Sequence, residues 1–200
     1  MIVFKLLLVI TWIYLLSVFH RGKLEFFKFL FGSVGTFFII LNFVPYIKQP
    51  IISFFTYLLG LIGNFTNLFE GYAQYGMFFI DHNDTVMSLY IDLECSGLIE
   101  IMVFLSLITF FPIYNWKEKI KVGVTGCVFI YLFNFIRIIS IILLIYKFGS
   151  PMYAFAHSIA GRLIFYVCIV VLYFHIFTKA QISKQKIGKF DYDAIDKEDK

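Results

Sequence analysis

The sequence has few charged residues: Asp, Glu, Lys and Arg make up 15% of its 200 residues, whereas a soluble domain averages about 25%. It also has only three cysteines, two of them inside apolar runs, so we expect no disulfide framework. Neither C-x-x-C nor H-x-x-x-H occurs. Because the cysteines and histidines lack the usual spacing of a zinc site, we expect neither a metal nor a cofactor.

Apolar and aromatic residues dominate instead. Hydrophobic residues make up 60% of the chain and aromatic residues 21%. Several apolar runs exceed the roughly 18 residues that suggest a membrane span. The net charge of +4 does not indicate a nucleic-acid partner, because Lys and Arg gather at the ends of these runs. The sequence therefore predicts an integral protein of the lipid bilayer, with one membrane domain over residues 1–178.

The distribution of charge predicts how the chain crosses the membrane. Basic connectors follow the first, the fourth and the last apolar run, and by the positive-inside rule they face the cytoplasm. The stretch 70–94 contains five acidic residues and no Lys or Arg, so we place it outside. The N-terminus then lies outside, and a charged tail over 179–200 is cytoplasmic. The apolar runs cover residues 2–19, 29–47, 51–69, 96–114, 122–146 and 152–177.

Segment 51–69 has two interpretations. An odd number of crossings must join the basic connector to the acidic stretch, and segment 29–47 already supplies one. Segment 51–69 also carries a polar stripe at helical spacing, formed by Ser53, Thr56, Gly60, Asn64 and Asn67. We expect a helix that lies in the outer interface of the membrane. The alternative is a sixth transmembrane span with a more polar face.

The acidic stretch contains two runs rich in β-forming residues. YGMFFID and TVMSLYIDL flank the turn sequence HND, so residues 73–93 predict a short external hairpin. The expected fold is an all-α polytopic membrane bundle of about five transmembrane helices, with an outer interfacial helix and this β-hairpin.

Three polar residues stand out in apolar surroundings. Cys95 opens an apolar helix in LECSGLIE, Arg137 lies within NFIRI, and His157 lies in FAHSIAGR. Ionisable groups at membrane depth are costly and often functional. Together these three supply a nucleophile, an anion stabiliser and a proton carrier for acyl transfer. The charge-based topology places all three in the outer half of the bilayer.

The same residues have plainer interpretations. Cys95 can be a small buried hydrophobe, although a position at a helix start is expected to lower the pKa of its thiol. Arg137 can pair with Glu100, with Asn134 on the same helix face orienting the guanidinium. Arg162 is the other candidate partner of Glu100.

Three motifs carry a resemblance. They are E-C-S-G at 94–97 after an external strand pair, N-x-x-R at 134–137, and the histidine of AHSIAG at 156–161. Their order and context resemble the exosortase/archaeosortase family of membrane cysteine transpeptidases, in the compact form found in Gram-positive bacteria. The resemblance covers a catalytic core of about residues 50–178.

The resemblance implies a sortase-like reaction at the outer face of the cytoplasmic membrane. The substrates would be secreted proteins whose C-terminal signal is a short motif, a transmembrane helix and a basic end. Cys95 would form a thioester, His157 would protonate the leaving amine, and Arg137 would stabilise the anionic intermediate. Further oxyanion donors would be the backbone N–H groups of Ser96 and Gly97. The acyl acceptor and the base of the first step stay open.

Two other function classes remain: a small transporter or channel, and a non-catalytic membrane scaffold. A transporter predicts a polar path through the inner half of the bundle, where ionisable residues are nearly absent. A scaffold predicts no special reactivity at Cys95. The small residues Ala156, Ala160 and Gly161 near His157 either pack within the bundle or admit a substrate helix.

Overall fold

A computed structural model describes residues 2–82 and 85–184. The chain is mostly helical, with one small sheet between the third and fourth helices. The elements are α1 (Ile2–Arg21), α2 (Glu25–Leu41), α3 (Val44–Thr66), β1 (Phe69–Tyr72), β2 (Met77–His82), β3 (Thr85–Tyr90), η1 (Leu93–Cys95), α4 (Leu98–Phe110), α5 (Trp116–Phe148), η2 (Ser150–Met152), α6 (Tyr153–Phe155), η3 (Ala156–Ala160), α7 (Gly161–Tyr173), η4 (Phe174–Thr178) and α8 (Lys179–Lys184).

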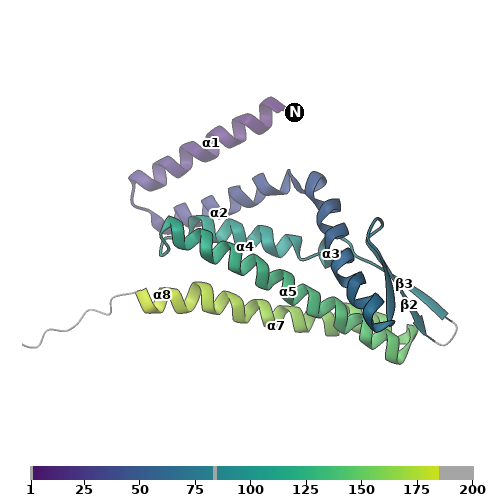
Figure 1. Ribbon diagram of the computed structural model, residues 1–200. Helices are drawn as coiled ribbons and strands as arrows, with labels where there is room; N and C mark the ends of the chain where they lie inside the picture. The colour runs from purple at the N-terminus through teal and green to yellow at the C-terminus, as the bar shows by residue number, and fades with distance from the viewer. Residues whose placement is uncertain (1, 83–84, 185–200) are drawn as a thin grey trace, which may run out of the picture.

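The long helices form a bundle with two distinct ends. Helix α1 packs on α2, α2 on α4, α4 on α5, and α5 on α7. The sheet and α3 lie at one end and α8 at the other (Figure 1). At the α8 end, the Tyr114 hydroxyl donates to the Ile176 carbonyl oxygen (2.7 Å), which joins the α4–α5 connection to the last helices. The basic connectors therefore lie opposite the acidic stretch, as the charge pattern predicts. Which side of the membrane each end faces stays a prediction.

The helical bundle is confirmed, but the count of five spans is not. Among the described residues, Trp116–Phe148 and the continuous run Ser150–Ile182 are long and apolar enough to cross a membrane. Helices α2 and α3 together would form a third span, but they are bent by 74°. Helix α4 has 13 residues and is about 20 Å long, shorter than the roughly 30 Å of a hydrocarbon core. It ends at Phe110, because Phe111 precedes Pro112 and adopts an extended conformation.

Helix α3 contains most of the segment for which an interfacial position is expected. The expected crossing 29–47 instead ends with α2 at Leu41, and the chain then turns sharply (Figure 1). The predicted polar stripe is exposed only in part: Thr56 and Gly60 are buried, and α3 packs against the sheet, whereas Asn64 and Asn67 are exposed. Whether α3 spans the bilayer or lies at its surface stays a prediction.

The predicted hairpin is present as β2 and β3, which pair antiparallel from Met77↔Tyr90 to His82↔Thr85. Its turn falls partly on residues 83–84, outside the described residues. The sheet has a third strand, β1, which pairs antiparallel with β2 in the order β1-β2-β3. The prediction missed β1 because FEGY is short and follows the apolar segment 51–69 without a clear break.

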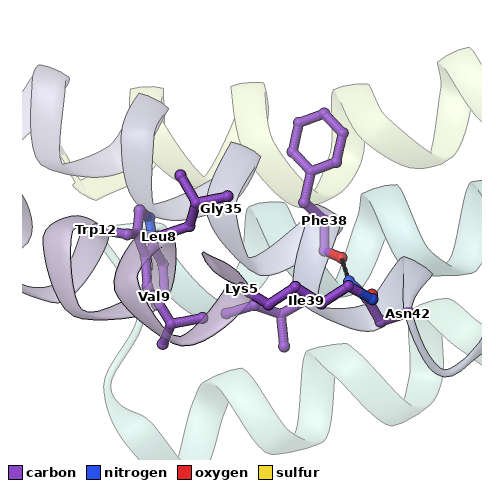
Figure 2. A pocket seen from close by; sticks show the side chains of 8 residues that line it. All are labelled: Lys5, Leu8, Val9, Trp12, Gly35, Phe38, Ile39 and Asn42. Atoms are coloured by element: carbon purple, nitrogen blue, oxygen red, sulfur yellow. Dashed lines mark hydrogen bonds between the residues drawn. The ribbon is translucent and has the colours of Figure 1, made fainter. Parts of the chain in front are cut away.

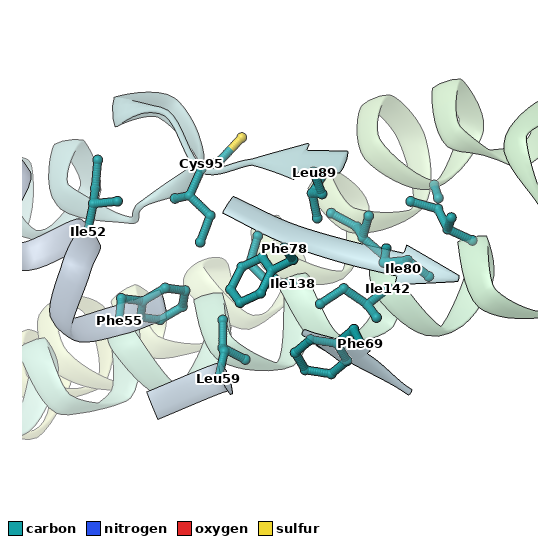
Figure 3. Packing of buried hydrophobic residues seen from close by; sticks show 14 residues of the cluster. Ile52, Phe55, Leu59, Phe69, Phe78, Ile80, Leu89, Cys95, Ile138 and Ile142 are labelled. Atoms are coloured by element: carbon teal, nitrogen blue, oxygen red, sulfur yellow. The ribbon is translucent and has the colours of Figure 1, made fainter. Parts of the chain in front are cut away.

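A hydrophobic core fixes the sheet to the bundle. The fully buried Phe55, Phe78 and Ile138 bring together α3, β2 and α5. Burial of each such side chain contributes about 1.5–3 kcal/mol. Cys95 lies at the edge of this cluster, with its sulfur directed away from Phe55 and Phe78 (Figure 3). The core thus holds the backbone that leads to Cys95.

Helix α1 is attached to α2 through polar contacts around a small pocket. Lys5 Nζ donates to Asn42 Oδ1 (2.7 Å), and Trp12 Nε1 donates to the Phe31 carbonyl oxygen (2.8 Å). The pocket between the two helices measures about 270 Å³ (Figure 2). The rest of α1 exposes apolar side chains, as expected for a helix at the edge of a membrane bundle.

Because α3 packs closely on β1, we expect alanine substitutions at two glycines of α3 to change the stability of the protein differently. A Cβ atom at Gly63 would clash with the backbone carbonyl oxygen of Phe69, whereas at Gly60 it would lie 3.5 Å from the nearest atom, Gly71 Cα. We expect Gly63→Ala to lower the free energy of unfolding by about 1–3 kcal/mol. Gly60→Ala should be neutral or stabilising by up to about 1 kcal/mol through helix propensity. Thermal unfolding in detergent measures both, and equal stabilities would contradict this packing.

Candidate active site

A hydrogen-bonded turn before α4 positions Cys95. Asp92 Oδ1 accepts from the Leu93 backbone N–H (2.6 Å) and from Lys48 Nζ (2.7 Å). The Lys48 hydrogen bond lowers the pKa of Asp92, so this carboxylate stays charged near neutral pH. Ser96 Oγ donates to the Leu93 carbonyl oxygen (2.7 Å) and accepts from the Leu98 N–H (3.3 Å). These contacts join α3, η1 and α4 around the cysteine.

The turn brings the E-C-S-G and N-x-x-R motifs into contact. Gly97, the N-cap of α4, has φ +74°, a conformation that favours glycine. A Cβ atom there would lie 3.3 Å from Asn134 Cβ. The fully buried Asn134 donates from Nδ2 to the Cys95 carbonyl oxygen (2.9 Å). Asn134 therefore holds the cysteine backbone, which corrects the expectation that it orients the Arg137 guanidinium.

Cys95, Arg137 and His157 meet at one point, as their predicted depths indicate. Cys95 Sγ lies 3.7 Å from His157 Nε2 and 3.8 Å from Arg137 Nη2. The three residues come from η1, α5 and η3, which are separated along the chain by long apolar segments. The arrangement places a thiol between an imidazole and a guanidinium.

Two aromatic residues that the sequence did not single out support this arrangement. The Arg137 guanidinium carbon lies 5.5 Å from the ring centroid of the buried Phe165, a cation–π contact. The His157 ring stacks on Tyr153, with centroids 5.7 Å apart and planes 7° apart. Tyr153 precedes His157 by four residues, a spacing that places both on one helix face. His157 also lies in a π-helical turn, a feature frequent at functional sites.

Burial raises the pKa of the Cys95 thiol, while the nearby Arg137 charge acts in the opposite direction. The expectation of a lowered pKa at a helix start is therefore wrong. The physical reason is the burial of the thiol. In addition, α4 begins only at Leu98, after the Gly97 N-cap, so Cys95 lies outside its first turn. A protonated thiol at neutral pH needs a base, and His157 Nε2 faces its sulfur.

The predicted oxyanion donors are available only in part. The Ser96 backbone N–H donates to the Leu93 carbonyl oxygen (3.4 Å), so it is not free as expected. The Gly97 N–H has no hydrogen-bond partner among the residues that the structure describes. Arg137 Nε is also buried without a partner in that part of the chain. Gly97 and Arg137 are thus the donors that remain for an anionic intermediate.

A cavity of about 270 Å³ opens beside Cys95. Within the described ranges, Glu100 and Arg162 make no ion pair with each other, although both line this cavity. Glu100 Oε2 is buried and has no hydrogen-bond partner among described residues. No cluster of His, Cys, Asp and Glu suited to a metal ion occurs in residues 2–82 and 85–184. The polar lining of the cavity consists of Glu94, Cys95, Glu100, Arg137, Arg162 and Tyr166.

The chain was compared with models of protein families, with curated proteins and with solved structures. A family model described as transmembrane exosortase (Exosortase_EpsH) matches residues 2–174. The match covers most of the chain and contains all three motifs. No curated protein and no solved structure gives a significant match.

The charges around Cys95 predict the pH dependence of its alkylation. In a chain with Cys127→Ala and Cys168→Ala, labelling by a small neutral reagent should rise with pH, with a midpoint above that of an ordinary thiol. Arg137→Gln removes a positive charge that favours the thiolate, so the midpoint should move still higher. Arg162→Gln should move it in the same direction by less. A midpoint near neutral pH, or a downward shift in Arg137→Gln, would contradict this electrostatic description.

Proposed function

Because the chain belongs to the transmembrane exosortase family, we propose that it is a membrane cysteine peptidase or transpeptidase acting on secreted proteins. It cleaves their C-terminal sorting signal, which consists of a short motif, a transmembrane helix and a basic end. The observation that carries the proposal is the position of Cys95 Sγ, 3.7 Å from His157 Nε2 and 3.8 Å from Arg137 Nη2.

The first half of the reaction forms a thioester. His157 Nε2 takes the thiol proton of Cys95 as Sγ attacks the scissile carbonyl carbon, so His157 is the base of this step. The developing oxyanion accepts hydrogen bonds from the Arg137 guanidinium and the Gly97 N–H. His157 then returns the proton to the leaving nitrogen, and the peptide bond breaks. The substrate's transmembrane helix leaves with its new amino terminus.

The second half releases the product. A nucleophile, either water or an amine or hydroxyl acceptor, gives its proton to His157 and attacks the thioester carbonyl. The same donors stabilise the second oxyanion, and Cys95 leaves as a thiol after taking the proton back. The chemistry at Cys95 is the same for hydrolysis and for transfer.

The proposed orientation places the sheet end of the bundle at the outer face of the cytoplasmic membrane. The N-terminus then lies outside and the C-terminus in the cytoplasm. This orientation is supported by the acidic stretch at the sheet end and by the basic connectors at the α8 end. It exposes Cys95 to secreted proteins that are still held in the bilayer by their C-terminal helix.

The transporter alternative has less support. Below the site, the bundle contains a buried apolar cluster that includes Phe104, Ile130 and Leu172. In the described part of the chain, these apolar side chains occupy the interior where a transporter needs polar groups. A scaffold does not account for a thiol, an imidazole and a guanidinium that meet at one cavity.

Substitutions at the three residues test the proposed reaction. In cells that carry Cys95→Ala, secreted proteins should accumulate with their C-terminal helix uncleaved. Arg137→Gln should slow cleavage by about 10²–10³-fold, and His157→Gln by about 10²–10⁴-fold. Mass spectrometry of membrane fractions measures the uncleaved C-terminal peptides.

The matched control is Cys168→Ala, since Cys168 is partly buried among apolar residues of α7 away from the site. Its cleavage activity and its thermal stability should equal those of the wild type. Normal processing in Cys95→Ala cells would contradict a cysteine mechanism. Loss of activity that follows only a loss of folded protein would contradict the assigned roles of Arg137 and His157.

A further inference from the structure

A groove along α4 and α7 is formed by two successive hollows that share no lining residue: the Cys95 cavity and an apolar hollow nearer the α8 end of the bundle. Near Cys95, its walls are Glu100 of α4 and Arg162 and Tyr166 of α7. Farther along, the same two helices and α2 border an apolar groove of about 700 Å³. Its lining includes Phe29, Leu107, Phe111, Val170, Phe174 and Phe177.

Helical periodicity shows that the two hollows lie along the same helix faces. On α4, Glu100 of the cavity precedes Leu107 of the apolar groove by seven residues, about two helical turns, so both lie on one face. On α7, Ile169 and Tyr173 of the apolar groove follow Arg162 of the cavity by seven and eleven residues, about two and three helical turns, so all three lie on one face. Both α4 and α7 pack on α5. Helix α5 therefore lies behind the groove and contributes Arg137 to its polar end.

The dimensions and chemistry of this groove fit a transmembrane helix. From Arg162 to Thr178 the wall has a length of about 24 Å at ~1.5 Å per residue, close to the roughly 30 Å of a hydrocarbon core. The end at Cys95 is polar and the remainder is apolar. A sorting signal has the same order, with a polar motif followed by an apolar helix. Apolar exposure alone is ordinary in a membrane protein, whereas a groove that reaches the nucleophile is specific.

We propose that this groove binds the transmembrane helix of the substrate and thereby sets the depth of the scissile bond at Cys95. The inference rests on the proposed function and assigns it a substrate-binding surface. The apolar helix packs along Leu107, Val170 and Phe174, as in other helix-in-groove complexes. Its preceding motif then reaches the polar cavity, and the carbonyl to be attacked lies beside Cys95 Sγ.

The small residues near His157 do not provide an alternative entrance. Ala156 is fully buried. A Cβ atom at Gly161 would lie 2.7 Å from Ile141 Cδ1, so this face of the helix packs against α5. Ala156 and Gly161 therefore pack within the bundle instead of admitting a substrate helix.

Two adjacent valines of α7 provide a matched test. Val170 lines the proposed groove, while Val171 lines a different apolar groove of about 460 Å³ between α5 and α7, away from Cys95. Both side chains are exposed, by 67% and 51%, so a larger residue fits at either position without disturbing the core.

The first experiment places a photo-crosslinking amino acid at Val170 or at Val171 in the full-length Cys95→Ala chain in membranes. The probe is the secreted protein found to accumulate uncleaved in Cys95→Ala cells. We expect its C-terminal helix to crosslink from position 170 and not from position 171. Equal crosslinking from both positions, or crosslinking only to lipid or to a second copy of the chain, would overturn the proposal.

The second experiment compares Val170→Trp with Val171→Trp in the otherwise wild-type chain. Val170→Trp should lower kcat/KM by roughly tenfold or more, mainly through KM, because it blocks a contact site for the helix. Val171→Trp should leave kcat/KM unchanged. Equal kinetics for the two variants would exclude a role for the groove.

The two proposals fail in different ways. If Cys95→Ala stops cleavage but Val170 neither crosslinks nor affects KM, the proposed function stands and the groove is wrong. If Cys95→Ala leaves every secreted protein normally cleaved, the proposed function is wrong, and the groove proposal is overturned with it.

Discussion

The hydrogen bond from Asn134 Nδ2 to the Cys95 carbonyl oxygen is the contact on which the geometry of the site depends. It joins the turn before α4 to the middle of α5, where Arg137 follows Asn134 by three residues on nearly the same helix face. Gly97 permits the contact, because a side chain at its left-handed position would press against Asn134. One amide thus fixes the distance between the thiol and the guanidinium. Removing the amide would leave a carbonyl oxygen without its partner in a buried place, at a cost of about 1–3 kcal/mol.

The same site keeps several buried polar atoms without hydrogen-bond partners among the described residues. They include Arg137 Nε, His157 Nδ1 and Glu100 Oε2. Unpaired groups of this kind cost stability, so a fold retains them where they serve binding or chemistry. The peptide substrate that we propose would supply carbonyl oxygens and N–H groups, which are the partners that these atoms lack. The hydrophobic core on one side and the aromatic contacts of Phe165 and Tyr153 on the other hold the unpaired groups in place.

Much of this arrangement follows from the sequence because it depends on charge and on helical rise. Basic connectors and one acidic stretch predict which ends of the helices lie together. Cys95, Arg137 and His157 then fall at similar depths. The structure brings a nitrogen of Arg137 and a nitrogen of His157 within 4 Å of the Cys95 sulfur. The β2–β3 hairpin was also predictable, since two runs rich in β-forming residues flank a turn sequence.

The remainder depends on contacts between distant segments, which local patterns do not contain. The strand β1 forms because α3 and β2 provide a surface for it. The Cys95 thiol is buried by residues far along the chain, and this burial reverses the effect expected from a helix start. Asn134 binds a carbonyl 39 residues away in the sequence. For the same reason, apolar length alone did not give the number of spans: α3 bends away from α2, and α4 is short.

The most direct test of the account is mass spectrometry of the Cys95 peptide from protein isolated with its substrate during turnover. The account predicts an acyl adduct on Cys95 whose mass matches the substrate up to its cleavage site. Neutral hydroxylamine should release the adduct, because a thioester is cleaved under those conditions. An adduct on another residue, or cleavage that proceeds with Cys95 never modified, would contradict the assignment of Cys95 as the nucleophile.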